Sequence, residues 1–134
     1  MIMPLAGTES AILQSWQPGL WRFHFPQGSA VLAGVTDRTG DLESLRSQRG
    51  VSRGLVTADQ VHGVSVAAVD LPAAPSQPLA GCDALVTQTF GLGLTIRTAD
   101  CLPLFLWDPI QRVVGVAHAG WRGLAADLPL RVMG

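Results

Sequence analysis

The sequence is poor in charged residues and has no tyrosine. Only 14% of its 134 residues are charged, and the formal net charge is −1. A protein that binds nucleic acid or an anionic membrane through its charge carries a basic excess, and this chain has none. We therefore expect neither a nucleic-acid partner nor a membrane partner.

The sequence also lacks a long hydrophobic run. The longest apolar runs, 102–107 and 113–117, have the length of strands, whereas a bilayer span needs about 20 residues. The opening residues 1–6 contain no basic segment, and their apolar stretch ends at Gly7. The pattern of a secretory signal is therefore missing, and a cytoplasmic location is predicted.

Cysteine is scarce, since the chain contains only Cys82 and Cys101. In a reducing cytosol a cysteine is more often structural, metal-binding or nucleophilic than disulfide-bonded. We interpret Cys82, at the start of an expected strand, as a packing residue. A glycine-rich phosphate loop is missing as well, because the segment 91–93 lacks the third glycine of a dinucleotide-binding turn.

What the sequence does contain is a series of strand patterns. Strands are predicted at 21–25, 30–35, 54–58, 64–69, 83–87, 92–97, 102–107 and 112–118. Helices are expected at 41–49 and after Gly120, where Pro129 interrupts the second turn. The proline-containing segment 71–81 is predicted to be a surface loop. The length fits one domain over 1–134, and the apolar runs of the second half predict strands buried on both faces.

Three segments combine rare polar residues with glycine or proline at the expected strand ends. They are 60–63 (QVHG), 98–103 (TADCLP) and 117–123 (AHAGWRG). One cysteine and two histidines from separate strand ends, Cys101, His62 and His118, suit a three-ligand metal site with an open position, as in catalytic zinc centres. Their spacing matches no local zinc motif. A histidine hydrogen-bonded in a turn and a cysteine that packs as a small hydrophobe therefore remain as alternatives.

The same segments resemble those of the bacterial multicopper polyphenol oxidases, or laccase-domain proteins, now regarded as purine nucleoside phosphorylases with adenosine deaminase activity. The most specific match is 118–123, and 82–87 and 96–103 are also similar. The similarity extends over about 34–123. It implies an α+β fold with mixed β-sheets flanked by helices, related to that of deamidating toxins, and one metal ion bound by the residues His62, Cys101 and His118.

The resemblance also implies a function. It points to a zinc-dependent purine nucleoside phosphorylase that acts on adenosine, inosine and methylthioadenosine and also deaminates adenosine, with copper as the alternative metal. The implied partners are a purine nucleoside and phosphate. Catalytic roles are expected for Cys101, His118, Asp100 and Arg97, and substrate contacts for Arg122 and Gln60. Surface ion pairing is the alternative role for both arginines.

The chain departs from the family pattern in two places. The region before His62 is short, and family members continue for roughly another hundred residues. The resemblance therefore implies a C-terminally truncated member with part of the purine pocket missing, and an exposed apolar surface that a homo-oligomer would cover. Two other functions stay open: a metal-free amide hydrolase with Cys101 as nucleophile and His118 as base, and a catalytically inactive remnant that still binds metal.

Overall fold

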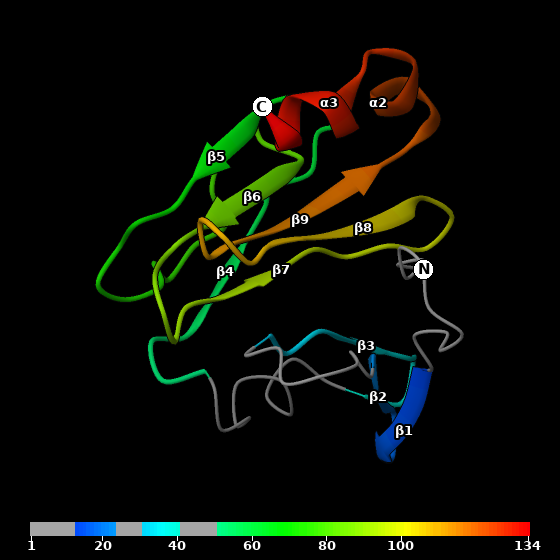
Figure 1. The fold of residues 1–134 in the computed structure, drawn as a ribbon. Helices are drawn as coiled ribbons and strands as arrows, with labels where there is room; N and C mark the ends of the chain where they lie inside the picture. Colours follow the sequence, from blue (N-terminus) through cyan, green and yellow to red (C-terminus); the bar gives the residue numbers. More distant parts are fainter. Residues whose placement is uncertain (1–12, 24–30, 41–50) are drawn as a thin grey trace. The chain divides into compact units, whose positions relative to one another are not determined.

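A computed structural model describes residues 13–23, 31–40 and 51–134 (Figure 1). The chain divides into two compact units, residues 1–51 and 52–134. The helix predicted at 41–49 lies outside the described residues. Compact units of this size can be parts of one domain or separate domains. The expectation of one domain therefore stays a prediction.

The first unit contains an antiparallel three-stranded sheet. Its strands, in spatial order, are β1 (Leu13–Gln17), β2 (Leu20–Phe23) and β3 (Gly34–Thr36). The turn between β1 and β2 contains Gly19 with φ at +77°, and a Cβ atom there would lie 2.4 Å from the backbone nitrogen of Gly40. Glycine is therefore needed at position 19 for both conformation and space.

The second unit contains two sheets and two short helices (Figure 1). The four-stranded sheet has the order β5-β6-β9-β8, with β5 parallel to β6 and the other pairs antiparallel. Its strands are β5 (Val66–Ala68), β6 (Ala84–Thr87), β8 (Leu102–Asp108) and β9 (Val113–Ala119). The remaining elements are the parallel pair β4 (Leu55–Thr57) and β7 (Gly93–Thr95), and the helices α2 (Trp121–Ala125) and α3 (Leu128–Met133). The predicted α+β class with mixed sheets is confirmed.

Both faces of the four-stranded sheet are covered. Successive residues of a strand point to opposite faces, so Leu85 and Val116 pack with Val56 of β4. Ala84 and Ala117, one position away, pack with Leu128 of α3 on the other face. The sheet therefore lies between the β4–β7 pair and the C-terminal helices, and β9 is buried from Gly115 to Ala119.

Strand β8 corrects the expectation that the apolar strands of the second half are buried on both faces. None of its residues is fully buried, because β8 lies at the edge of the sheet and pairs only with β9. The effect of Pro129 on the helix also differs from the expectation. It lies in the first turn of α3, where a missing N–H costs no helical hydrogen bond. Across the described parts of the chain, no helix is long and apolar enough to span a bilayer.

Candidate metal centre

His62 lies in the connection between β4 and β5, in an uncommon backbone conformation. The φ angles of Gln60 and His62 are +65° and +60°, in the left-handed region that costs a non-glycine residue about 1–2 kcal/mol. Such conformations persist where surrounding contacts impose them, and they occur often at functional sites. For His62 the main contacts come from the carboxylate of Asp83.

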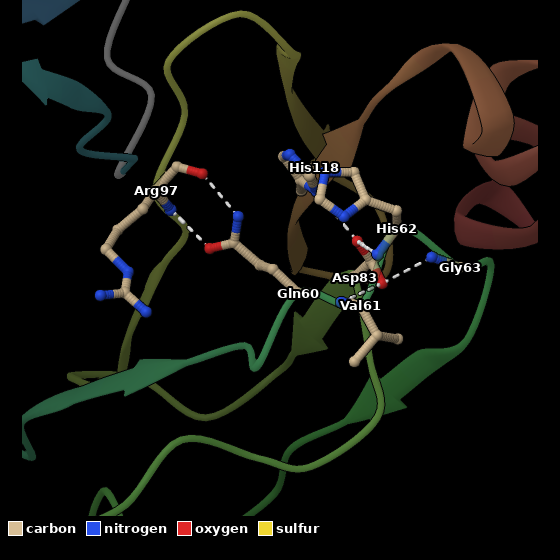
Figure 2. A network of polar contacts seen from close by, with 7 residues as sticks. All are labelled: Gln60, Val61, His62, Gly63, Asp83, Arg97 and His118. Atoms are coloured by element: carbon tan, nitrogen blue, oxygen red, sulfur yellow. Dashed lines mark hydrogen bonds and ion pairs between the residues drawn. The ribbon is translucent and has the colours of Figure 1, made fainter.

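Asp83 is fully buried directly before β6, and its carboxylate binds the backbone of the His62 segment (Figure 2). Its Oδ1 accepts hydrogen bonds from the backbone N–H groups of Val61, at 3.0 Å, and Gly63, at 2.9 Å. Its Oδ2 accepts one from the N–H of His62 at 3.0 Å and lies 2.9 Å from Nδ1 of His118. One carboxylate thus contacts both histidine segments.

These contacts decide the charge state of Asp83. Burial by itself would raise the pKa of the carboxyl group, because it disfavours the charged form. The hydrogen bonds from the His118 ring and from the N–H groups of Gly63, Val61 and His62 favour the ionised form and outweigh burial, so the pKa of Asp83 lies below its ordinary value. Asp83 is therefore a carboxylate at neutral pH.

The register of the sheet places His118 and Cys101 near each other. Asp83 and His118 are the neighbours in sequence of the paired residues Ala84 and Ala117. The backbone N–H of His118 donates to the carbonyl oxygen of Asp83 at 2.7 Å. Cys101 directly precedes β8, whose first residue pairs with Ala119 at the end of β9. The cysteine and the histidine therefore lie at the same end of two neighbouring strands.

The structure brings His62, Cys101 and His118 together. One potential ligand atom from each lies within 4.8 Å of the others, and the two imidazole rings meet edge to face with centroids 5.0 Å apart. Three ligands of a single tetrahedral ion lie about 3.5 Å apart, so small side-chain rotations would close the difference. Zinc binds thiolate and imidazole groups, and catalytic zinc sites have three protein ligands and an open fourth position, so the cluster fits such an ion.

Gly120 provides the space beside this cluster. A Cβ atom at this position would lie 3.2 Å from Sγ of Cys101 and 3.6 Å from Cδ2 of His62. The backbone angles of Gly120, φ −77° and ψ 174°, are open to any residue. A side chain at position 120 would therefore crowd the thiol of Cys101, and glycine is not needed here for its conformational freedom.

Gln60 connects the His62 segment to the segment that leads to Cys101. Its Nε2 donates to the carbonyl oxygen of Arg97 at 2.5 Å, and its Oε1 accepts from the N–H of Arg97 at 2.6 Å (Figure 2). Both polar atoms of the amide thus bind backbone. The predicted contact between Gln60 and a substrate stays a prediction.

The other predicted site residues lie on the surface. Arg97, Asp100 and Arg122 are all exposed, and the guanidinium of Arg122 lies 5.0 Å from the centre of the Trp121 ring. Asp100 is not one of the clustered potential ligands. Their roles toward phosphate, ribose or a proton stay predictions.

Asp83 and Gly120 belong to the site, although sequence reasoning assigned neither of them a role there. A signal for Asp83 is present, because it is an ionisable residue at the start of an apolar strand, and a buried charge requires partners. The spatial role of Gly120 carries no such signal, since it depends on how the β8–β9 pairing brings Cys101 to it and on how the distant His62 segment folds beside it.

Comparison with known proteins agrees with this geometry. The family model described as multi-copper polyphenol oxidoreductase laccase matches residues 37–133. The purine nucleoside phosphorylase ORF3 of Streptomyces griseus is 49% identical over 74 residues, covering 55% of this chain and 30% of that protein. Adenosine deaminase RL5, from an unknown prokaryotic organism, is 40% identical over 85 residues, covering 59% and 32%.

Solved structures show the same fold. YlmD from Geobacillus stearothermophilus superimposes with a TM-score of 0.68 at 27% identity, covering 88% of this chain and 56% of that one. The chain spans about a third of the length of the two curated relatives described above. Because the family model matches well over half of the chain, this protein belongs to the multi-copper polyphenol oxidoreductase laccase family.

Proposed function

We propose that this protein is a metal-dependent enzyme of purine nucleosides in which His62, Cys101 and His118 hold one zinc ion, with copper as the alternative. The observation that carries the proposal is the convergence of these three side chains beside Gly120. Relatives named purine nucleoside phosphorylase and adenosine deaminase support the choice of substrate class. The proposed reactions are phosphorolysis of adenosine, inosine and methylthioadenosine, and deamination of adenosine.

Each of the proposed site residues would have a separate role. When bound, zinc supplies Lewis-acid polarisation and activation of water. Cys101 would bind as the thiolate and the two histidines as neutral rings. The exposed guanidinium groups of Arg97 and Arg122 are suited to bind phosphate or ribose oxygens. Asp100 directly precedes Cys101 in the chain and is the proposed proton acceptor.

The proposal is tested by following both reactions with chelated and zinc-loaded protein. Product analysis would measure free adenine formed from adenosine and inorganic phosphate, and inosine formed from adenosine. We expect turnover with one equivalent of zinc, and loss of turnover in the chelated protein and in the variants His62→Ala and Cys101→Ser.

The matched control is Asp59→Asn, which changes an exposed carboxylate that accepts a hydrogen bond from the Gly81 N–H. This control should retain activity. Undiminished turnover in the chelated protein or in Cys101→Ser would refute the proposed function. Bound zinc without turnover in the wild type would instead support the alternative of an inactive metal-binding remnant.

One observation favours a second candidate, a metal-free amide hydrolase. The contact between Asp83 and His118 resembles the pair that orients the base in enzymes with a cysteine nucleophile, and Cys101 lies in the same cluster. The two candidates differ in their response to reagents. A hydrolase of this kind would remain active with chelator and lose activity when the thiol is alkylated.

A further inference from the structure

The carboxylate of Asp83 contacts two of the three proposed ligand residues, which come from different parts of the chain. We propose that Asp83 is a positioning residue that holds the proton of His118 on Nδ1, so that the lone pair of Nε2 is directed to the metal. The same carboxylate fixes the backbone that carries His62. This inference rests on the proposed metal centre.

The hydrogen bonds of Asp83 determine where the proton of His118 lies. A neutral imidazole has one N–H and one lone pair. Oδ2 of Asp83 lies 2.9 Å from Nδ1, and the carboxylate already accepts three backbone N–H groups. A group surrounded by donors acts as an acceptor, so Nδ1 must donate. Nε2 is then the unprotonated nitrogen, as metal binding requires.

Asparagine at position 83 changes the hydrogen bonding while keeping the shape. Oδ1 of Asp83 faces two backbone N–H groups and Oδ2 faces one, so the amide oxygen of Asn is favoured at the Oδ1 position. The amide NH2 then points at Nδ1 of His118, which has to accept. The proton of the ring moves to Nε2, the nitrogen that the metal needs.

The first experiment uses the wild-type protein without metal. Nitrogen–proton correlation spectra of the histidine side chains, recorded at a pH where the ring carries one proton, identify the tautomer of His118. We expect the Nδ1–H form. Because this measurement needs no variant, it decides the inference even if a substitution at position 83 prevents folding, and the Nε2–H form would overturn it.

The second experiment compares Asp83→Asn with wild type in the same spectra and in zinc affinity, measured by competition with a chromophoric chelator. The variant should show the Nε2–H form and bind zinc about 10–100-fold more weakly, the usual effect of losing a partner of a metal-bound histidine. Asp59→Asn is the matched control and should change neither quantity. Wild-type tautomer and wild-type affinity in Asp83→Asn would overturn the inference.

The two proposals fail in different ways. Wild-type protein that shows the Nδ1–H form but binds no zinc would refute the metal centre and still support the hydrogen-bond assignment. Wild-type protein that binds one zinc ion and catalyses both reactions, but shows the Nε2–H form without metal, would refute the role of Asp83 alone.

Discussion

At the scale of single residues, the candidate centre depends on a position without a side chain. Alanine at position 120 would place a methyl group 3.2 Å from Sγ of Cys101, closer than an ordinary van der Waals contact, and would crowd this proposed ligand. We expect Gly120→Ala to bind zinc at least tenfold more weakly, as measured by competition titration. The far-ultraviolet circular dichroism should not change, because the backbone angles of Gly120 suit alanine.

Gly115, a glycine within β9, provides the control for this prediction. In Gly115→Ala the added methyl group would meet Cγ1 of Val86 at 3.1 Å, so the change affects packing and not the ligands. This control should lose stability and keep its zinc affinity. Equal zinc affinity in Gly120→Ala and wild type would show that the ion does not bind beside Gly120.

The residues of the centre differ in how far sequence predicts them. His62, Cys101 and His118 stand in distinctive segments, and the structure brings them together. Asp83 was missed because an aspartate at the start of an apolar strand indicates only that a buried charge needs partners, and not which four hydrogen-bond donors supply them. Those donors lie 20–35 residues away in the chain, and only the folded sheet brings them near.

At the scale of elements, the two hydrogen bonds between Gln60 and the Arg97 backbone connect the His62 and Cys101 segments. Gln60→Ala removes both bonds, each worth about 1 kcal/mol. If the loss of one of these hydrogen bonds weakens the placement of the ligands by its full free energy, zinc affinity should fall about fivefold. Competition titration against a chelator measures the change.

Gln88→Ala is the matched control for this link. The Gln88 side chain also donates to a backbone carbonyl, that of Gln111, and so connects two turns away from the ligands. It should leave zinc affinity unchanged. A fall of the same size in Gln60→Ala and Gln88→Ala would contradict a specific role for Gln60.

The turn after β3 allows a prediction of pH dependence in the first unit. The carboxylate of Asp37 accepts hydrogen bonds from the hydroxyl and the backbone N–H of Thr39 and from the Trp21 ring, and these bonds lower its pKa. A lowered pKa stabilises the folded state above the unfolded pKa, about 3.9 for aspartate, and this contribution is lost as pH falls through the lower folded value.

We therefore expect wild type to be more stable than Asp37→Asn near neutral pH, with the difference shrinking below about pH 4. Urea unfolding at a series of pH values, followed by tryptophan fluorescence, measures the two free energies of unfolding. A difference that stays constant down to about pH 2 would contradict the role of the ionised carboxylate.

Most elements of the second unit follow the strand patterns of the sequence, with ends that differ by up to two residues. Pattern alone did not distinguish an edge strand from a central one. The apolar run of β8 is as continuous as that of β9, yet only β9 has neighbours on both sides. In the first unit, Gln14, Ser15 and Gln17 leave β1 without an apolar pattern, so the sequence does not predict it.

At the scale of the whole molecule, large apolar side chains are exposed. Ile110 is 91% exposed and Phe90 is 83% exposed, and their turns are connected by the bond from Gln88 to Gln111. We propose that a second copy of the chain covers such side chains. Sedimentation should show self-association that rises with concentration and weakens in the double variant Phe90→Ser/Ile110→Ser. A monomer at every concentration would contradict the proposal.

The three proposed ligands, together with Asp83, Gln60 and Gly120, all belong to the second unit. The centre therefore depends on the pairing of β6, β9 and β8 and on the β4–β5 connection. Turnover is a separate matter, since the chain spans about a third of the length of the curated relatives discussed above. Activity thus depends on metal binding.

The most direct test is a crystal structure of the protein loaded with zinc. We predict one ion bound by His62, Cys101 and His118, with zinc–nitrogen distances of about 2.0–2.1 Å and a zinc–sulfur distance of about 2.3 Å. Nε2 of His118 should face the ion. Zinc bound elsewhere, or a cluster of these side chains that stays free of metal at saturating zinc, would contradict the proposed metal centre.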